Sequence, residues 1–354
     1  MIDYLNIADV DIINVINKYD IQKRDKGYSM NAKARQRSYK NCVVAFDIET
    51  TTIDELEQSI MYIWQLQIED LTIIGRTWEE FYKACVDMVS VLGKNEYIVI
   101  FVHNLSFEFQ WLSEVFKDTL KNVFCMDSRK VLKFDVLNHI EFRCSYSVSG
   151  MSLANLAENL KTAKIEKLSG DDYDYKKVRH SETPMTELEM KYCEHDVLIL
   201  HYWINEEIAK NGGSIAKIPL TQTGYVRREC REYILSRCYR GIYKRMIKRA
   251  TPDADCFTLL HKTFAGGDTH GNYLHVRQVV DNVYSYDFAS SYPAVMVKCK
   301  FPRKFIKLDI VDKEMFENVL NKKACLFKCS FEHVKAKRHH HTLSLSKCDT
   351  IREK

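Results

Sequence analysis

The chain has 354 residues, of which 46% are hydrophobic and 28% are charged, the mixture of a folded protein of about two domains. No apolar run approaches the length of a membrane-spanning helix, and Asp3 stands where a secretory signal would carry Lys or Arg. The sequence therefore predicts a cytoplasmic protein that is not secreted and has no membrane partner.

Charge is distributed unevenly along the chain. Residues 213–354 hold 27 Lys and Arg against 14 Asp and Glu, a net charge of +13, whereas residues 1–212 have a net charge of −9. An acidic half can gather metal-binding carboxylates, and a basic half can bind a polyanion. Two unrelated solvated surfaces would give the same totals, so charge alone leaves both interpretations open.

The first half of the chain alternates strand and helix patterns. Residues 1–40 mix a short apolar segment with a basic stretch, and we expect them to form a lead-in. The unbroken apolar run of residues 42–46 predicts a buried strand. Further strands are expected at residues 61–68 and 96–102, and helices at residues 78–92, 106–116, 152–160 and 186–209. This alternation predicts an α/β layer domain.

The second half begins after the glycine pair at residues 212–213. Residues 223–249 have the pattern of a basic helical connector, with nine Lys or Arg against two Glu in residues 227–249. Residues 282–286 predict a strand that runs into Asp287 and a new helix.

Carboxylates follow the predicted strands of the first half. Asp47 and Glu49 are expected to close the first strand, where alternate side chains share a face and can hold Mg²⁺ or Mn²⁺ together. Glu108 lies beyond the strand of residues 96–102. Tyr192 and Asp196 are four apart on a predicted helix, so they point the same way. Any one of these is more often a surface or capping residue, but all of them in this order indicate a metal site.

These three segments resemble the Exo I, Exo II and Exo III motifs of the 3′–5′ proofreading exonuclease in family B DNA polymerases of the protein-primed type, found in phages and mobile elements. The resemblance implies a ribonuclease H-like exonuclease domain that binds two Mg²⁺ or Mn²⁺ ions and acts on single-stranded DNA 3′ ends in a bacterial host cell. It assigns metal binding and catalysis to Asp47, Glu49, Glu108 and Asp196, with Tyr192 orienting the attacking water and Lys167 near the scissile phosphate. Glu108 departs from the family's Asp.

The same resemblance implies a path for the frayed DNA strand. Residues 151–156 are similar to the family's Ser/Thr-Leu motif for the primer end. The expected DNA-binding residues of this domain are Thr50, His103, Asn104, Phe107, Ser152 and Leu153. Phe107 offers a ring on which a base can stack.

Residues 286–293, Tyr-Asp-Phe-Ala-Ser-Ser-Tyr-Pro, resemble motif A of family B polymerases. The resemblance makes Asp287 a ligand of the catalytic metals and assigns Ser290, Ser291 and Tyr292 to the incoming deoxynucleoside triphosphate. Phe264, Gly266 and Gly267 resemble the loop that joins the exonuclease and polymerase domains and contacts DNA. Phosphate contact by Arg227, Arg228 and Arg231 of the connector is expected as well, although such a helix face is often only solvated.

The expected domains are a lead-in (1–40), the exonuclease (41–212), the connector (213–262), a partial α+β palm with motif A (263–300) and the start of an insertion that binds a priming terminal protein (301–354). The family's later motifs are missing, so the resemblance indicates a truncated, split or frameshifted polymerase with a role in DNA replication on primer–template DNA. A free-standing exonuclease and a non-catalytic module that binds DNA or terminal protein stay open as alternatives.

Overall fold

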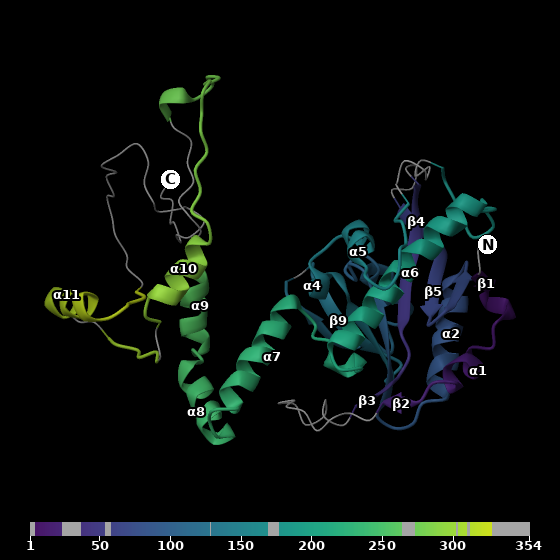
Figure 1. The fold of residues 1–354 in the computed structure, drawn as a ribbon, viewed down its shortest axis with the longest axis horizontal. Coiled ribbons are helices and arrows are strands. Elements are labelled where there is room, and N and C mark those ends of the chain that lie inside the picture. The colour runs from purple at the N-terminus through teal and green to yellow at the C-terminus, as the bar shows by residue number, and fades with distance from the viewer. Residues whose placement is uncertain are drawn as a thin grey trace, which may run out of the picture. The chain divides into compact units, whose positions relative to one another are not determined.

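The computed structural model in Figure 1 describes residues 4–22, 37–53, 58–127, 129–168, 177–263, 273–301, 304–309 and 312–327. The chain divides into two units, residues 1–230 and residues 231–354. None of the helices described is long and apolar enough to cross a membrane.

A mixed β-sheet forms the centre of the first unit. Its strands lie in the order β1-β6-β5-β4-β7-β10-β9-β8, and the short β3 pairs with β7 and β2. β4, β5 and β6 form an antiparallel meander, whereas β7 is parallel to β4 and β10 is parallel to β7. The strands are β1 (Tyr4–Asn6), β2 (Ile21–Gln22), β3 (Ser38–Lys40), β4 (Val44–Ile53), β5 (Gln58–Ile68), β6 (Leu71–Gly75), β7 (Glu96–Val102), β8 (Lys121–Cys125), β9 (Val131–Val136) and β10 (Ile140–Cys144).

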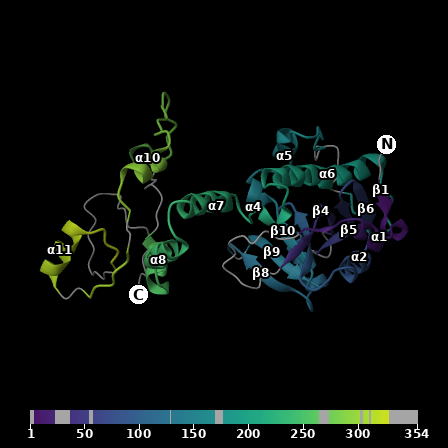
Figure 2. The same cartoon turned by 60° about the horizontal axis from the view of Figure 1, so that its bottom comes forward.

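Helices cover both faces of this sheet, as Figure 2 shows for α6 on one side and α2 on the other. The helices of the unit are α1 (Ile12–Asn17), α2 (Trp78–Ser90), α3 (Phe109–Val115), α4 (Tyr146–Ser149), α5 (Leu153–Asn159), α6 (Glu187–Lys210) and most of α7 (Gln222–Leu235), with short 3₁₀ turns at Ile7–Asp9 and Ile215–Lys217. The result is the α/β ribonuclease H-like layer domain that the sequence predicts.

The alternation of side chains along β4 produces the two layers. Val44 and Phe46 belong to a buried cluster with α1, α2 and α3, whereas Val43 and Ala45 belong to a second cluster with α5 and α6. Successive strand residues point to opposite faces, so one apolar run supplies both cores. A third, smaller cluster joins Ile63 of β5 to Cys193 of α6.

The two long helices of the unit begin at capping boxes. Thr77 caps α2 with Glu80, and Thr186 caps α6 with Glu189, each pair exchanging side-chain and backbone hydrogen bonds. These boxes satisfy amide groups that the first helical turn leaves unpaired. They fix where α6 starts and hence which of its residues face the sheet.

Two boundaries differ from the prediction. The first strand does not end at Asp47 and Glu49, because β4 pairs with β5 as far as Ile53 and leaves both acids in mid-strand. Residues 4–22 also belong to the layer domain instead of a separate lead-in, since β1 extends the sheet beside β6 and Ile12 and Ile16 are buried in the core.

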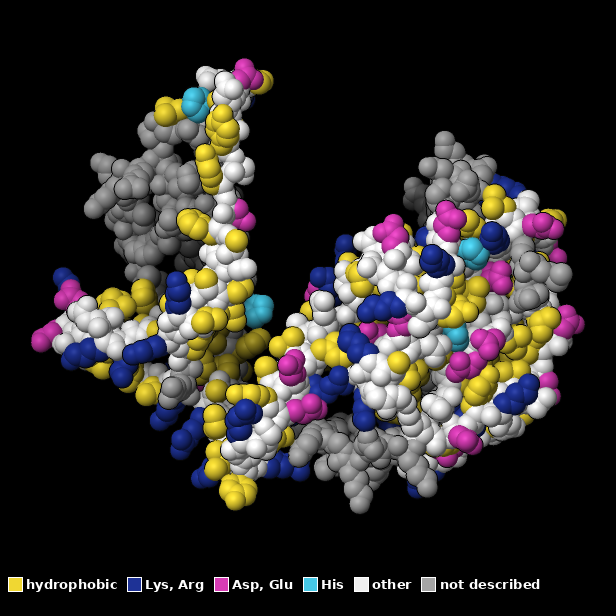
Figure 3. Space-filling view, in the orientation of Figure 1, with side chains coloured by type: hydrophobic (Ala, Val, Ile, Leu, Met, Phe, Trp, Pro, Cys, Tyr) yellow, Lys and Arg dark blue, Asp and Glu magenta, His cyan; other side chains and the backbone are white. Residues whose placement is uncertain are grey.

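The second unit contains α8 (Arg240–Ala250), α9 (Ala254–Thr263), α10 (Ser291–Lys298) and α11 (Lys313–Lys322), with a 3₁₀ turn at Tyr273–His275. The expected basic helical connector consists of two helices, α7 and α8. The strand predicted at residues 282–286 is wrong, because this segment forms no strand and pairs with none in the part of the chain that the structure describes. Among the residues described in this unit none is buried, and Figure 3 shows Lys and Arg side chains around α8.

Gly75 of β6 lies close to the Trp64 ring of β5, so a substitution at Gly75 tests how these two strands pack. A Cβ atom at Gly75 would lie 2.1 Å from Cζ2 of Trp64, whose fully buried ring is held by a 2.8 Å hydrogen bond to the Thr77 carbonyl. Gly75→Ala should therefore lower the free energy of unfolding by about 1–3 kcal/mol in urea denaturation followed by Trp fluorescence. Gly241→Ala is the control, since a Cβ there meets nothing within 4 Å. Equal stability of Gly75→Ala and the parent would contradict this packing.

Candidate metal centre

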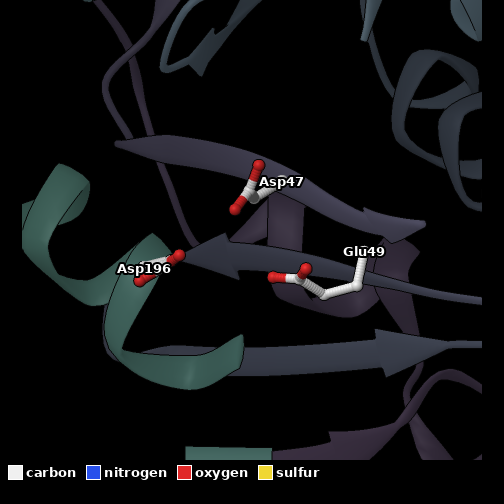
Figure 4. Close-up of side chains that lie close together, drawn as sticks. All are labelled: Asp47, Glu49 and Asp196. Carbon is white, nitrogen blue, oxygen red and sulfur yellow. The ribbon is translucent and has the colours of Figure 1, made fainter. Parts of the chain in front are cut away.

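Three carboxylates from two elements converge on one face of the sheet. Asp47 and Glu49 of β4 and Asp196 of α6 each offer an oxygen, and these oxygens lie within 4.8 Å of one another. Figure 4 shows the three side chains pointing into the same space. It is the only group of three or more potential metal ligands among the residues that the structure describes.

The backbone explains why these residues meet. Asp47 and Glu49 are two apart on β4, so both project toward α6. The pairing of β4 with β5 shifts register just after Glu49, at a β-bulge, which bends the strand beside the site. On α6, Tyr192 and Asp196 are both buried against the sheet, so the prediction that they share a helix face is confirmed.

Lys167 closes the cluster from a loop segment. Its Nζ lies 2.5 Å from both Oδ1 and Oδ2 of Asp196 and 3.8 Å from the centre of the Tyr192 ring. The side chain of Lys167 is only 18% exposed and contacts two predicted site residues.

Burial of the three acids close together raises the pKa of each carboxyl group. Burial, followed by the charge of Asp196, raises the pKa of Asp47 to about 7, although Lys167 opposes the rise. Burial, then Asp47 and Asp196, holds the pKa of Glu49 well above its usual range. Burial also raises the pKa of Asp196, against the pull of Lys167. Without a cation the cluster therefore binds protons that isolated carboxylates would release.

Glu108 lies beside Asp47 but is not one of the three converging ligands. Its side chain is 3% exposed, it interacts electrostatically with Asp47, and its Oε2 has no hydrogen-bond partner among the residues described. Burial and the charge of Asp47 raise the pKa of Glu108 well above its usual range. A buried carboxyl oxygen without a partner is costly unless a ligand or water completes it.

The residues expected to hold the DNA strand differ in their exposure. Asn104 has a positive φ of 60° and is exposed, and Phe107 is 40% exposed and packs against Trp111. His103 contacts the Ser145 hydroxyl at 3.0 Å, and burial lowers its pKa to about 4. The aromatic ring of Phe107 is therefore available for stacking.

The remaining residues expected to bind DNA in this domain have structural contacts of their own. Thr50 follows the bulge on β4 and is partly buried. Ser152 caps α5 by accepting from the Asn155 amide, and Leu153 packs on the second hydrophobic cluster.

The motif A residues are not assembled into a site within the described part of the chain. Asp287 is exposed and accepts a hydrogen bond from the Phe288 amide, and Ser290 precedes α10, on which Ser291 and Tyr292 lie. Phe264, Gly266 and Gly267 lie outside the described residues.

The three arginines predicted to contact phosphate all lie on α7. Arg228 donates to the Lys217 carbonyl and lies 5.1 Å from the Tyr225 ring centre, so part of its donor capacity is used inside the protein. Arg227 is exposed and Arg231 is half-buried.

Two residues near the centre have no motif in the sequence that marks them. Arg179 is 2% exposed, binds Glu189 at 2.5 Å and lowers the pKa of Glu49 through its charge. Gln65 is fully buried opposite Asp47 in the β4–β5 pairing. The sequence gives one indication that Gln65 is buried: it directly follows Trp64 on a predicted strand.

The donor set fits a hard divalent cation. Three carboxylates offer only oxygen ligands, which Mg²⁺ and Mn²⁺ prefer, and the orphaned oxygen of Glu108 adds a further acceptor nearby. The converging charges, which burial makes costly, are those that a cation would neutralise.

Comparison with known families agrees with this geometry. Residues 24–211 match a family described as 3′–5′ exonuclease, and residues 118–352 match one described as DNA polymerase type B, organellar and viral. Each match covers more than half of the chain. The chain therefore belongs to the type B DNA polymerases of the organellar and viral kind, a family of nucleotidyltransferases, and it carries their 3′–5′ exonuclease domain.

Among solved structures the chain is similar to phi29 DNA polymerase. The match to that polymerase complexed with single-stranded DNA has a TM-score of 0.49 and 16% identity, and covers 66% of this chain and 41% of that one. The match to its orthorhombic crystal form has a TM-score of 0.45 and 18% identity, with 66% and 40% coverage. The chain thus matches less than half of that polymerase, and no curated protein matches its sequence.

The raised pKa of Asp47 predicts how metal-free stability depends on pH. In the folded state its pKa rises from 3.8 to about 7, so folding takes up a proton between these values and stability falls as pH rises through about 7. Asp47→Asn removes this loss. Urea denaturation in EDTA at about pH 8 should find the variant more stable than the parent by at least about 1.4 kcal/mol, the equivalent of one pKa unit. The difference should vanish near pH 4, and equal stabilities at both pH values would contradict the assignment.

Proposed function

We propose that this chain is a metal-dependent 3′–5′ exonuclease that removes nucleotides from single-stranded DNA ends, as the proofreading part of a protein-primed type B DNA polymerase. One observation carries the proposal: the oxygens of Asp47, Glu49 and Asp196 converge within 4.8 Å in a domain of the exonuclease family. Phosphodiester hydrolysis needs an activated water and a positive charge for the leaving oxygen, which two divalent cations about 4 Å apart supply when bound.

The chain's own residues divide the work. By the family resemblance Asp47 would be shared between the two ions, and Glu49 and Asp196 would complete their ligand shells, since the oxygens of all three side chains converge. Tyr192, beside Asp196 on α6, is placed to orient the attacking water. Lys167 is within reach of the same space, and its ammonium can stabilise charge on the scissile phosphate.

Glu108 reaches the site through Asp47. Its side chain is one methylene longer than the Asp usual in this family, and it contacts the Asp47 carboxyl from the segment after β7. We assign to it the fourth carboxylate of the site. Burial favours its protonated form, and a cation at the centre would replace that proton.

Exposed side chains near the centre support binding of a DNA 3′ end. Phe107 presents its ring to solvent and Asn104 its amide, and both follow β7 next to Glu108. Thr50, His103, Ser152 and Leu153 complete the proposed path, and Arg227, Arg228 and Arg231 are proposed phosphate contacts of the connector.

The polymerase part of the function rests on the family match over residues 118–352. By that membership we assign deoxynucleoside triphosphates to Asp287, Ser290, Ser291 and Tyr292, and primer–template DNA to Phe264, Gly266 and Gly267. A priming terminal protein and a role in DNA replication are proposed on the resemblance to the protein-primed type.

A non-catalytic DNA-binding module is the less favoured alternative. Such a module would have no use for carboxylates held together at a cost in folding free energy, yet Asp47, Glu49 and Asp196 all remain and converge. A free-standing exonuclease would have the same metal centre. That alternative differs from the proposal only in the role of the second unit.

Replacing two ligands tests the exonuclease. The chain with about 5 mM Mg²⁺ or Mn²⁺ should degrade single-stranded DNA labelled at the 5′ end from its 3′ end. Asp47→Ala with Glu49→Ala should lower the rate by at least about a thousandfold, because the ions lose most of their protein ligands. Denaturing gels resolve the product ladder.

A control double variant removes the same number of negative charges from residues outside the metal centre. Glu114→Ala with Asp118→Ala removes two exposed acids near the end of α3 and should keep the parent rate. Digestion by the Asp47/Glu49 double variant at the parent rate would refute the assignment of the centre.

A further inference from the structure

Gln65 on β5 is a fully buried amide without hydrogen bonds. Its side chain is 0% exposed, and neither Oε1 nor Nε2 has a hydrogen-bond partner among the residues that the structure describes. Taking an amide out of water without a partner costs free energy, so buried amides in proteins are almost always paired. A partner that the described residues do not supply, such as a water held by a ligand, would satisfy this amide.

The β4–β5 pairing places this amide next to the acidic centre. Gln65 lies directly opposite Asp47, and opposed residues of an antiparallel pair project from the same face. Across from them on α6, burial raises the pKa of the Cys193 thiol, the charges of Glu49 and Asp196 raise it further, and the Gln65 amide opposes the rise. Cys193 therefore lies near both the amide and the acids, and Gln65 faces the space between β5 and α6 where the acids converge.

The same strand provides an internal comparison. Gln67 is also 0% exposed and lies two residues further along β5, on the same face. Its Nε2 donates to the Glu69 carbonyl at 2.5 Å, and its Oε1 accepts from the Thr72 hydroxyl at 2.6 Å. Both polar side-chain atoms of Gln67 thus have hydrogen-bond partners, whereas neither polar side-chain atom of Gln65 has one among the residues described.

We propose that Gln65 is a positioning residue of the metal centre, whose Oε1 accepts a hydrogen bond from a cation-bound water while its Nε2 donates to a carboxylate of the cluster. The proposal rests on the metal-dependent function proposed above. Water on a cation directs its hydrogens outward, so its protein partner must accept a hydrogen bond. Lys167 can only donate, whereas the amide of Gln65 can do both. Partners of this kind orient the ligands and strengthen metal binding.

Matched methionine substitutions test this role, since Met keeps an unbranched side chain of similar size and removes both polar atoms. The full chain, freed of metal with EDTA and dialysed, is titrated with Mn²⁺ by calorimetry, and its metal-free thermal midpoint is measured separately. Gln65→Met should bind Mn²⁺ about tenfold more weakly than the parent. Its metal-free midpoint should be unchanged or higher, because an unpaired amide has been removed.

Gln67→Met should behave in the opposite way. Its metal-free midpoint should fall, because the Thr72 hydroxyl and the Glu69 carbonyl lose their partner, while its affinity for Mn²⁺ stays that of the parent.

Three results would overturn the inference, and they are distinguishable. Parental Mn²⁺ affinity in Gln65→Met shows that the amide does not serve the metal. A fall in the metal-free midpoint of Gln65→Met like that of Gln67→Met shows that Gln65 is a structural residue. Absence of Mn²⁺ binding by the parent itself removes the proposed function together with the inference, whereas the first two results leave that function standing.

Discussion

Repulsion among confined carboxylates is the constraint on which this structure depends. Two negative charges about 5 Å apart repel by roughly 3 kcal/mol at an effective dielectric constant near 20, and here Asp47, Glu49 and Asp196 are held within that range. Glu108, buried beside Asp47, adds a fourth acid. A chain relaxes such a cluster unless the surrounding fold prevents it. The fold supplies that restraint, because β4 packs into a hydrophobic cluster on each face of the sheet and α6 packs into the second of these clusters.

The cluster is relieved in two ways in the absence of a cation. Lys167 brings one ammonium to Asp196, and protons are taken up by the remaining acids, as the raised pKa values of Asp47, Glu49 and Glu108 show. One ammonium cannot neutralise four carboxyl groups. A divalent cation would replace the protons, so the mutual repulsion of the carboxylates and their affinity for metal have the same electrostatic origin.

Much of this centre is predictable from the sequence because its spacing is local. Residues two apart on a strand, or four apart on a helix, lie on the same face. These rules correctly placed Asp47 on the same face as Glu49, and Tyr192 on the same face as Asp196. The end of the strand was not predictable, because β4 continues to Ile53 only through pairing with β5. Gln65 was missed for the same reason: its place opposite Asp47 depends on a register that no local pattern encodes.

The second unit shows the limit of local patterns more clearly. Motif A has a specific sequence, but Asp287 needs neighbouring carboxylates and strands to form a site. Among the described residues of this unit there is no strand, and no group of carboxylates gathers around Asp287. The strand expected at residues 282–286 does not form, because an apolar run becomes a strand only beside another, and the described residues offer it none.

Anomalous diffraction from crystals of this chain grown with Mn²⁺ tests the central claim most directly. The account predicts manganese peaks within about 2.0–2.3 Å of oxygens of Asp47, Glu49 and Asp196, with Lys167 moved away from at least one oxygen of Asp196 to free it for the ion. Crystals at a Mn²⁺ concentration of about 5 mM that show no peak among these three carboxylates, or that show manganese only elsewhere on the chain, would contradict it.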